Sequence, residues 1–226
     1  MMTTNDGRGL KSEVGRMRLE NRPGRYIAMC GDPKIWFPMR VTYQREMKVK
    51  AELDRLGIEN FVPMKYRIVE FRNQGTTEQR KQGETEIRRE LVPAVNNLIF
   101  VRTTQERISE LKMTNGLLEP LRYMMDRTAE DAHTIMTVPD AQMENFMRVA
   151  SVTDDSVMFL DEDSVVGKEG KRVEIMGGAF EGVTGVIRRV KRCKRVVVEL
   201  EGIASVVIAF VPARLLREIE NQGRTE

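Results

Sequence analysis

Few residues of this chain have side chains suited to catalysis or to binding a metal. The 226 residues include one histidine, His133, and two cysteines, Cys30 and Cys193, without the CxxC spacing of a zinc site. Most acid–base chemistry uses histidine or a bound metal. The sequence also contains neither a Gly-rich phosphate loop before a helix nor a GxSxG motif. We therefore expect no catalytic residues, no metal and no cofactor, with His133 lacking a role and the cysteines reduced.

The positive charge of the chain is concentrated in one stretch. Overall, 37 basic and 34 acidic residues leave a net charge of only +3, whereas residues 188–195 contain six cations. Such a stretch binds phosphates of nucleic acid or forms a solvated loop tip, and we keep both interpretations. Aromatic residues do not interleave with these cations, so base stacking is not indicated there. The candidate nucleic-acid-binding residues of this stretch are Arg188, Arg189, Lys191 and Arg192.

Residues 1–33 mix glycines, prolines and charges, which predicts a flexible extension. No run of about 18 apolar residues occurs in the chain, and the N-terminus lacks the apolar stretch of a signal peptide. We therefore expect a cytoplasmic protein that does not span a membrane.

Residues 34–150 alternate strands and helices in the order of a split βαβ unit, which predicts an α+β domain with helices on one face of an antiparallel-rich sheet. Pro38 predicts that the first strand lies at an edge or is bulged. Residues 72–90 are too polar to bury a face and predict a long loop or a protruding hairpin. The expected strands and helices span 35–41, 45–56, 58–64, 66–71, 98–101, 117–124 and the segment from Pro139 to Ala150. Thr103 and Glu106 predict a capping box that opens a further helix, ending at Asn115-Gly116.

An acidic linker, 151–167, precedes a second domain at 168–220. Short β-rich segments with glycine turns predict an all-β domain, a small barrel with strands at 171–176, 183–190, 195–200 and 205–211. Because the two periodicities are incompatible, we expect two separately folding units.

A glycine-rich turn is the most specific feature of the second domain. Gly178, Gly182 and Gly185 allow positive φ angles in a tight turn, and Phe180 can anchor that turn to a barrel. An ordinary β-hairpin is the alternative. The segment resembles a KOW motif, the start of the SH3-like barrel of NusG, its relatives and several ribosomal proteins, with Gly182 at the characteristic glycine.

The first domain resembles the N-terminal (NGN) domain of NusG, so that the resemblance covers about residues 35–219 in the family's domain order. The details are more similar to the specialised relatives, RfaH and the UpxY antiterminators of polysaccharide operons, than to housekeeping NusG. The segments that carry the resemblance are Trp36-Phe37, Leu53–Gly57, Phe61–Met64, Asn97–Val101 and Val138-Pro139-Asp140.

The resemblance implies a transcription elongation factor that docks on the clamp of RNA polymerase and favours processive elongation of specific operons, without catalysing a reaction. It also implies that the barrel recruits a partner such as Rho or a ribosomal protein. A housekeeping NusG remains an alternative. A ribosome-associated RNA-binding protein is another alternative, against which the nearly neutral charge counts. We expect no small-molecule substrate.

The resemblance also supplies candidate polymerase-binding residues: Leu98, Phe100, Pro93, Val92 and Arg40. Leu98 and Arg40 stand where relatives often have an aromatic residue, whereas Phe100 keeps the aromatic of the docking strand. If Leu98 and Phe100 face outward, they form an apolar docking patch. The alternative is that residues 98–101 are all core.

Lys48 and Arg55 are seven residues apart and share one face of the first helix. Relatives place basic residues of this helix near the non-template DNA strand, so both are candidates for contacting that DNA or nascent RNA. The alternative is a solvated face with salt bridges to Glu52 or Glu46.

Overall fold

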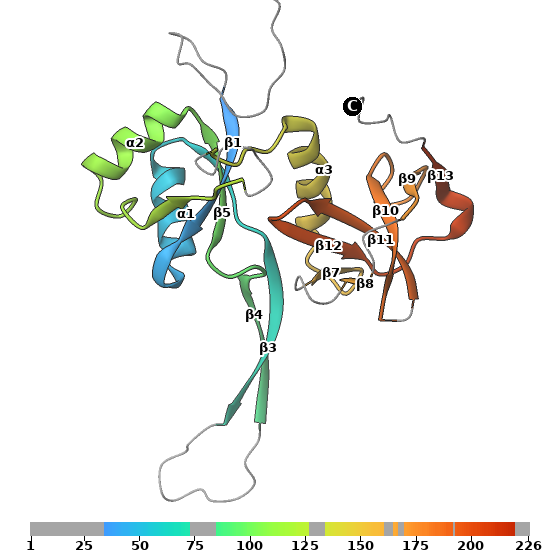
Figure 1. Ribbon diagram of the computed structural model, residues 1–226. Coiled ribbons are helices and arrows are strands. Elements are labelled where there is room, and N and C mark those ends of the chain that lie inside the picture. Colours follow the sequence, from blue (N-terminus) through green and yellow to red (C-terminus); the bar gives the residue numbers. More distant parts are fainter. Residues whose placement is uncertain are drawn as a thin grey trace, which may run out of the picture.

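The computed structural model describes residues 34–72, 85–126, 134–160, 165–166, 170–191 and 193–219. The expected extension 1–33, the centre of the 72–90 segment, parts of the linker, His133 and Arg192 lie outside the described residues. Figure 1 shows an N-terminal sheet with helices, a long two-stranded ribbon and a C-terminal sheet.

The N-terminal sheet is antiparallel and has the strand order β2-β5-β1-β6. Its strands are β1 (Ile35–Val41), β2 (Glu59–Phe61), β5 (Leu98–Thr103) and β6 (Leu121–Tyr123). The helices around it are α1 (Glu46–Arg55), α2 (Gln105–Thr114) and α3 (Asp140–Ala150). The α+β class expected for this part of the chain is confirmed.

Helices cover both faces of this sheet, so the expectation of helices on one face is wrong. Residues of α1 and α2 form one buried cluster with Phe37 and Ile99, whereas residues of α3 form another cluster with Trp36 and Phe100. Successive strand residues point to opposite faces. Because all four residues from Leu98 to Val101 are buried, β5 needs a cover on each side.

Pro38 lies in an interior strand, because β1 has β5 on one side and β6 on the other. The carbonyl of Trp36 accepts a hydrogen bond from Val138 N at 2.9 Å, and β6 pairs with β1 from Met39 onward. The backbone polar groups of Pro38 point to the same side as those of Trp36, two residues earlier. The missing N–H of Pro38 therefore falls in the gap between these two partners, and no edge position is needed.

The ends of α1 and α2 follow local signals, with one shift. Gly57, at φ 66°, ends α1 as expected. The N-cap of α2 is Thr104, whose hydroxyl accepts a hydrogen bond from Arg107 N at 3.3 Å, and not Thr103. Thr103 is buried as the last residue of β5, so it is not available as a cap.

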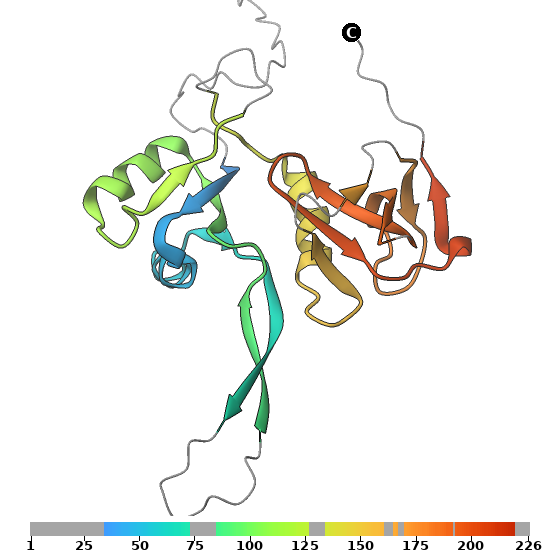
Figure 2. The ribbon, with the colours of Figure 1, turned by 60° about the horizontal axis from the view of Figure 1, so that its bottom comes forward.

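The strands β3 (Met64–Arg72) and β4 (Thr85–Pro93) form a two-stranded antiparallel ribbon that extends away from the N-terminal sheet (Figures 1 and 2). The alternative of a protruding hairpin is confirmed for these strands. Tyr66 pairs with Leu91, and Ile68 and Ile87 lie on the same face of the ribbon. All four side chains are exposed, so this face presents uncovered apolar residues beside Arg89 and Glu70 within the described chain.

The C-terminal sheet is antiparallel with the order β13-β9-β10-β11-β12-β7, and β8 pairs with β10. Among the described residues its end strands, β13 and β7, do not pair with each other, so closure into a barrel stays a prediction. Its strands are β7 (Val157–Leu160), β8 (Val165–Val166), β9 (Arg172–Ile175), β10 (Thr184–Val190), β11 (Cys193–Leu200), β12 (Ala204–Ile208) and β13 (Leu216–Glu218).

Part of the expected linker belongs to this sheet. Residues 157–160 form β7, which pairs with β12 from Ser205 to Ile208. The run Val157–Leu160 is apolar, as expected for a strand, but the acidic residues on both sides of it are typical of a linker. Val157 is buried in the hydrophobic cluster of α3.

Helix α3 stands between the N-terminal and C-terminal sheets (Figures 1 and 2). Its buried residues Met143, Phe146 and Val149 belong to one cluster with Phe100 of β5 and Val196 of β11. The two parts of the chain therefore share a single hydrophobic core, which we call the shared core.

Candidate functional site

Phe100 is fully buried beneath α3. Its ring centroid lies 5.8 Å from that of Phe146 on α3 and 6.4 Å from that of Phe61 on β2. Leu98 is 4% exposed on the same face. The interpretation of Leu98 and Phe100 as an outward apolar patch is therefore wrong, because both side chains are core. Which helix covers this face is a tertiary property that the strand sequence does not carry.

A groove opens beside this buried face. It is lined by the turn of residues 94–97, by α3 and by the C-terminal sheet, and Arg40, Lys65 and Leu98 contribute to its wall. Its volume of about 1630 Å³ exceeds the 300–1,000 Å³ that is typical of small-molecule pockets. The groove is therefore larger than a typical small-molecule site.

Val92 and Pro93 end β4 at the base of the ribbon and are half-buried. The next residue, Ala94, lines the groove and donates its N–H to Pro63 O at 2.8 Å. Arg40, which is exposed, lies on the groove as well. The structure thus brings Arg40 and the segment after Pro93 together at the groove, whereas Leu98 and Phe100 are both buried in the core.

Asn97 fixes the turn on which this surface depends. It adopts φ 60°, its carbonyl accepts from Val41 N at 2.9 Å, and its side-chain oxygen accepts from Gln44 N at 3.2 Å. Its own N–H donates to the buried carboxylate of Glu46. Asparagine tolerates this left-handed conformation, so the pair Asn96-Asn97 before a strand was the available sequence signal.

The two candidate cations of α1 differ in whether they form an ion pair. Arg55 donates to the Glu52 carboxylate from Nε at 2.9 Å and from its guanidinium at 2.6 Å, as the salt-bridge alternative predicted. The hydrogen bond from Arg55, followed by one from Asn115 at 2.6 Å, lowers the pKa of Glu52 to about 2. Lys48 is exposed and forms no ion pair within the described chain.

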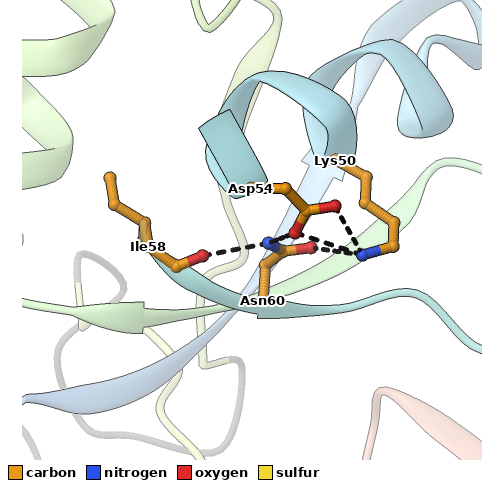
Figure 3. Close-up of polar contacts among 4 residues, drawn as sticks. All are labelled: Lys50, Asp54, Ile58 and Asn60. Atoms are coloured by element: carbon orange, nitrogen blue, oxygen red, sulfur yellow. Dashed lines mark hydrogen bonds and ion pairs between the residues drawn. The ribbon is translucent and has the colours of Figure 1, made fainter. Parts of the chain in front are cut away.

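Figure 3 shows the polar network that fastens the end of α1 to β2. Asp54 accepts hydrogen bonds from Asn60 at 2.7 Å and from Lys50 at 3.0 Å. Asn60 also donates to Ile58 O at 3.0 Å. The bonds from Asn60 and Lys50 hold the pKa of Asp54 below its usual value. Because Lys50 and Arg55 are paired, Lys48 is the α1 cation best placed to attract a phosphate.

The cations of the basic hairpin formed by β10 and β11 also differ in whether their charge is already paired. Arg188 is half-buried in the sheet and forms an ion pair with Glu199 at 2.7 Å, so its charge is already balanced. Arg189 and Lys191 are exposed, and Arg189 lies directly opposite Lys194 across the two strands. Like charges in that position repel each other and favour an anion between them. Of the candidate cations in this hairpin that the structure describes, Arg189 and Lys191 are free of an ion pair with Glu199 and exposed for phosphate binding.

The glycine-rich turn before β10 has the backbone expected of it at two positions, with φ 87° at Gly178 and φ 77° at Gly182. Gly185 serves another purpose, because a Cβ atom there would lie 2.7 Å from Val197 O on the neighbouring strand. Phe180 is half-buried and packs against the shared core.

Helix α3 holds this turn through polar contacts that the sequence did not indicate. Asn145 donates to Thr184 O at 2.7 Å and accepts from Thr184 N at 2.9 Å. Arg148 donates to Glu181 O at 3.0 Å. Asn145 is one of several polar residues on an amphipathic helix, and only its contact with the distant Thr184 gives it a role.

Within the part of the chain that the structure describes, no cluster of three or more His, Cys, Asp or Glu side chains could hold a metal. No described helix is long and apolar enough to cross a membrane.

The fold and the groove together define a binding protein built from a helix-covered antiparallel sheet and a second, all-β part. The family described as "NusG: Transcription termination factor nusG" matches residues 34–147, slightly more than half of the chain. The chain therefore belongs to the NusG family. Members of this family are non-enzymatic transcription factors that bind RNA polymerase, so the partner expected from the resemblance is confirmed at this level. Among curated proteins, none matches the chain.

Proposed function

We propose that this protein is an antitermination factor that docks on the clamp of RNA polymerase and promotes processive transcription of a restricted set of operons. Docking uses the groove wall formed by Arg40 and the turn that follows Val92 and Pro93, with Leu98 buried beneath it as support. The observation that carries this assignment is the meeting of these segments on one groove that is larger than a typical small-molecule site. The resemblance to RfaH and the UpxY antiterminators supports the restriction to few operons.

In this proposal the protein changes transcription only through the free energy of its binding to the polymerase. A ligand shifts an equilibrium between paused and elongating polymerase only by its differential affinity for the two states. A preference of about 1.4 kcal/mol for the elongating form changes the ratio of the two states about tenfold.

Nucleic acid and further proteins are secondary partners in this proposal. The cations Lys48, Arg189 and Lys191 contact phosphates of the non-template DNA or the nascent RNA, with Arg55 contributing when it leaves Glu52. The C-terminal sheet closes as an SH3-like KOW barrel and recruits Rho or a ribosomal protein.

Deletion followed by complementation tests the proposal. We expect deletion to remove promoter-distal transcripts of a few long operons, as measured by transcript profiling. Wild type and an Arg107→Glu control restore them, because Arg107 lies on α2, on the far side of the N-terminal sheet. Arg40→Glu does not restore them.

Two outcomes contradict the proposal. Changes across the whole genome would identify a housekeeping factor instead. Full restoration by Arg40→Glu, with the variant protein present at the wild-type level, would remove the groove from the docking surface.

A further inference from the structure

The two faces of the β3–β4 ribbon differ in charge. Successive residues of a strand point to opposite faces, so each face takes alternate side chains from both strands. Among the described side chains, one face carries three cations and one anion, which are Lys65, Arg67, Arg88 and Glu90. The other face carries one cation and one anion among four apolar side chains. We call it the mixed face, and its exposed residues are Tyr66, Ile68, Glu70, Ile87, Arg89 and Leu91.

The two charges of the mixed face are exposed and unpaired. Within the described chain, neither Arg89 nor Glu70 forms an ion pair, whereas Arg67 and Glu90 on the opposite face pair at 3.0 Å. Arg89 lies opposite Ile68, and Glu70 belongs to the next residue pair of the same face. The mixed face therefore offers one unpaired charge of each sign, side by side, within exposed apolar surface.

A second copy of the chain complements this pattern. An interface related by a two-fold axis uses the same patch on both copies, so its contacts are reciprocal. An axis that passes between Arg89 and Glu70 brings each guanidinium beside the carboxylate of the other copy, and the pairing is then made twice. The same operation on the opposite face brings three cations of one copy against three of the other, and like charges repel. The distribution of charge therefore favours contact through the mixed face.

We propose that the mixed face is a homodimer interface, in which the apolar side chains of two copies pack together and Arg89 pairs with Glu70 of the partner subunit. Nine residues in each strand give a face about 30 Å long and about 10 Å wide. This area of about 300 Å² is smaller than the roughly 800 Å² per partner of a standard stable interface. The dimer is therefore reversible and forms at micromolar or higher concentrations. It forms without polymerase, so its test is independent of polymerase docking.

Sedimentation velocity of the purified full chain over a series of concentrations tests the proposal, and we expect an equilibrium between monomer and dimer. Arg89→Glu and Glu70→Arg each replace an attraction by a repulsion at two symmetric positions, so each should weaken the dimer about tenfold. Ile87→Asp places a charge among the apolar side chains and should weaken it as well. Lys65→Glu is the matched control, because it makes the same change of charge on the opposite face of the ribbon.

A mixture of two variants makes the test specific for this contact. Arg89→Glu leaves only carboxylates at the proposed pair, and Glu70→Arg leaves only guanidinium groups. We expect labelled Arg89→Glu protein to form a dimer with unlabelled Glu70→Arg protein at about the wild-type affinity, although neither variant dimerises well alone. A thermal melt accompanies each variant and should be nearly unchanged, because both positions are exposed.

The proposal is overturned if the wild-type protein stays monomeric over the whole concentration series, or if it forms larger oligomers without a dimer. Wild-type dimerisation of Arg89→Glu, or failure of the two variants to associate when mixed, also overturns it. If a charge variant does not fold, Ile87→Asp decides, since an undiminished dimer of this variant excludes the mixed face as the interface.

Discussion

Glu52 lies on α1 and accepts hydrogen bonds from Arg55 on its own helix and from Asn115 at the end of α2. These bonds, that of Arg55 first, lower the pKa of Glu52 from 4.5 to about 2. A carboxyl group whose pKa is lower in the folded state stabilises that state above its unfolded pKa. The contribution of Glu52 is therefore fully present above about pH 5 and is lost as the pH falls toward 2.

We expect Glu52→Gln to lower stability at neutral pH and to flatten the loss of stability between pH 5 and pH 2. Urea unfolding at a series of pH values measures both effects. Glu110→Gln is the control, because Glu110 forms an exposed pair with Arg107 and should leave the acid dependence nearly unchanged. An acid dependence of Glu52→Gln equal to that of wild type would contradict the assignment.

Helix α3 turns one face of the N-terminal sheet into core, and the rings of Phe100, Phe61 and Phe146 meet there. We expect Phe100→Ala to cost about 3–5 kcal/mol, as removal of a buried aromatic side chain usually does. Ile68→Ala, on the exposed face of the ribbon, should change stability by less than about 0.5 kcal/mol. Denaturant unfolding measures both, and a similar small effect for Phe100→Ala would restore the surface interpretation.

The helices and strands can be predicted from local sequence, whereas the packing of the helices on the faces of the sheet cannot. Val49 and Leu53 predict α1, and Gly57 predicts its end, because helical spacing and a left-handed stop act within a few residues. The side that α3 covers depends on a contact between residues about 46 positions apart, Phe100 and Phe146. The sequence also indicates Arg40, which lies at the groove, and its contact with the polymerase stays a prediction. Asn97 and Asn145 gain their roles only from distant partners, so local sequence does not indicate them.

The shared core joins the two parts of the molecule through α3, and Asn145 adds two hydrogen bonds to the backbone of Thr184. The two separately folding units expected from the sequence stay a prediction, and the shared core makes joint unfolding the alternative to test. We expect β5 and β11 to lose protection in a single transition when hydrogen exchange is followed through urea unfolding.

Asn145→Ala should lower the stability of both parts together by about 1 kcal/mol, because it leaves half-buried backbone groups of Thr184 without their partner. Gln142→Ala is the control, since Gln142 is exposed on the same helix. Separate midpoints for β5 and β11 in wild type would show instead that each part folds alone.

The ribbon of β3 and β4 has, within the described chain, no third strand on either side. Both edges therefore present backbone donors and acceptors that can pair with another strand. Tyr66, Ile68 and Ile87 add exposed apolar side chains on one face of the ribbon, which favour association with another apolar surface. Arg67 and Glu90, an ion pair on the other face, act as gatekeepers against stacking. We expect self-association of the free protein to begin at this ribbon, so that any partner covering it also acts as a chaperone for the factor it binds.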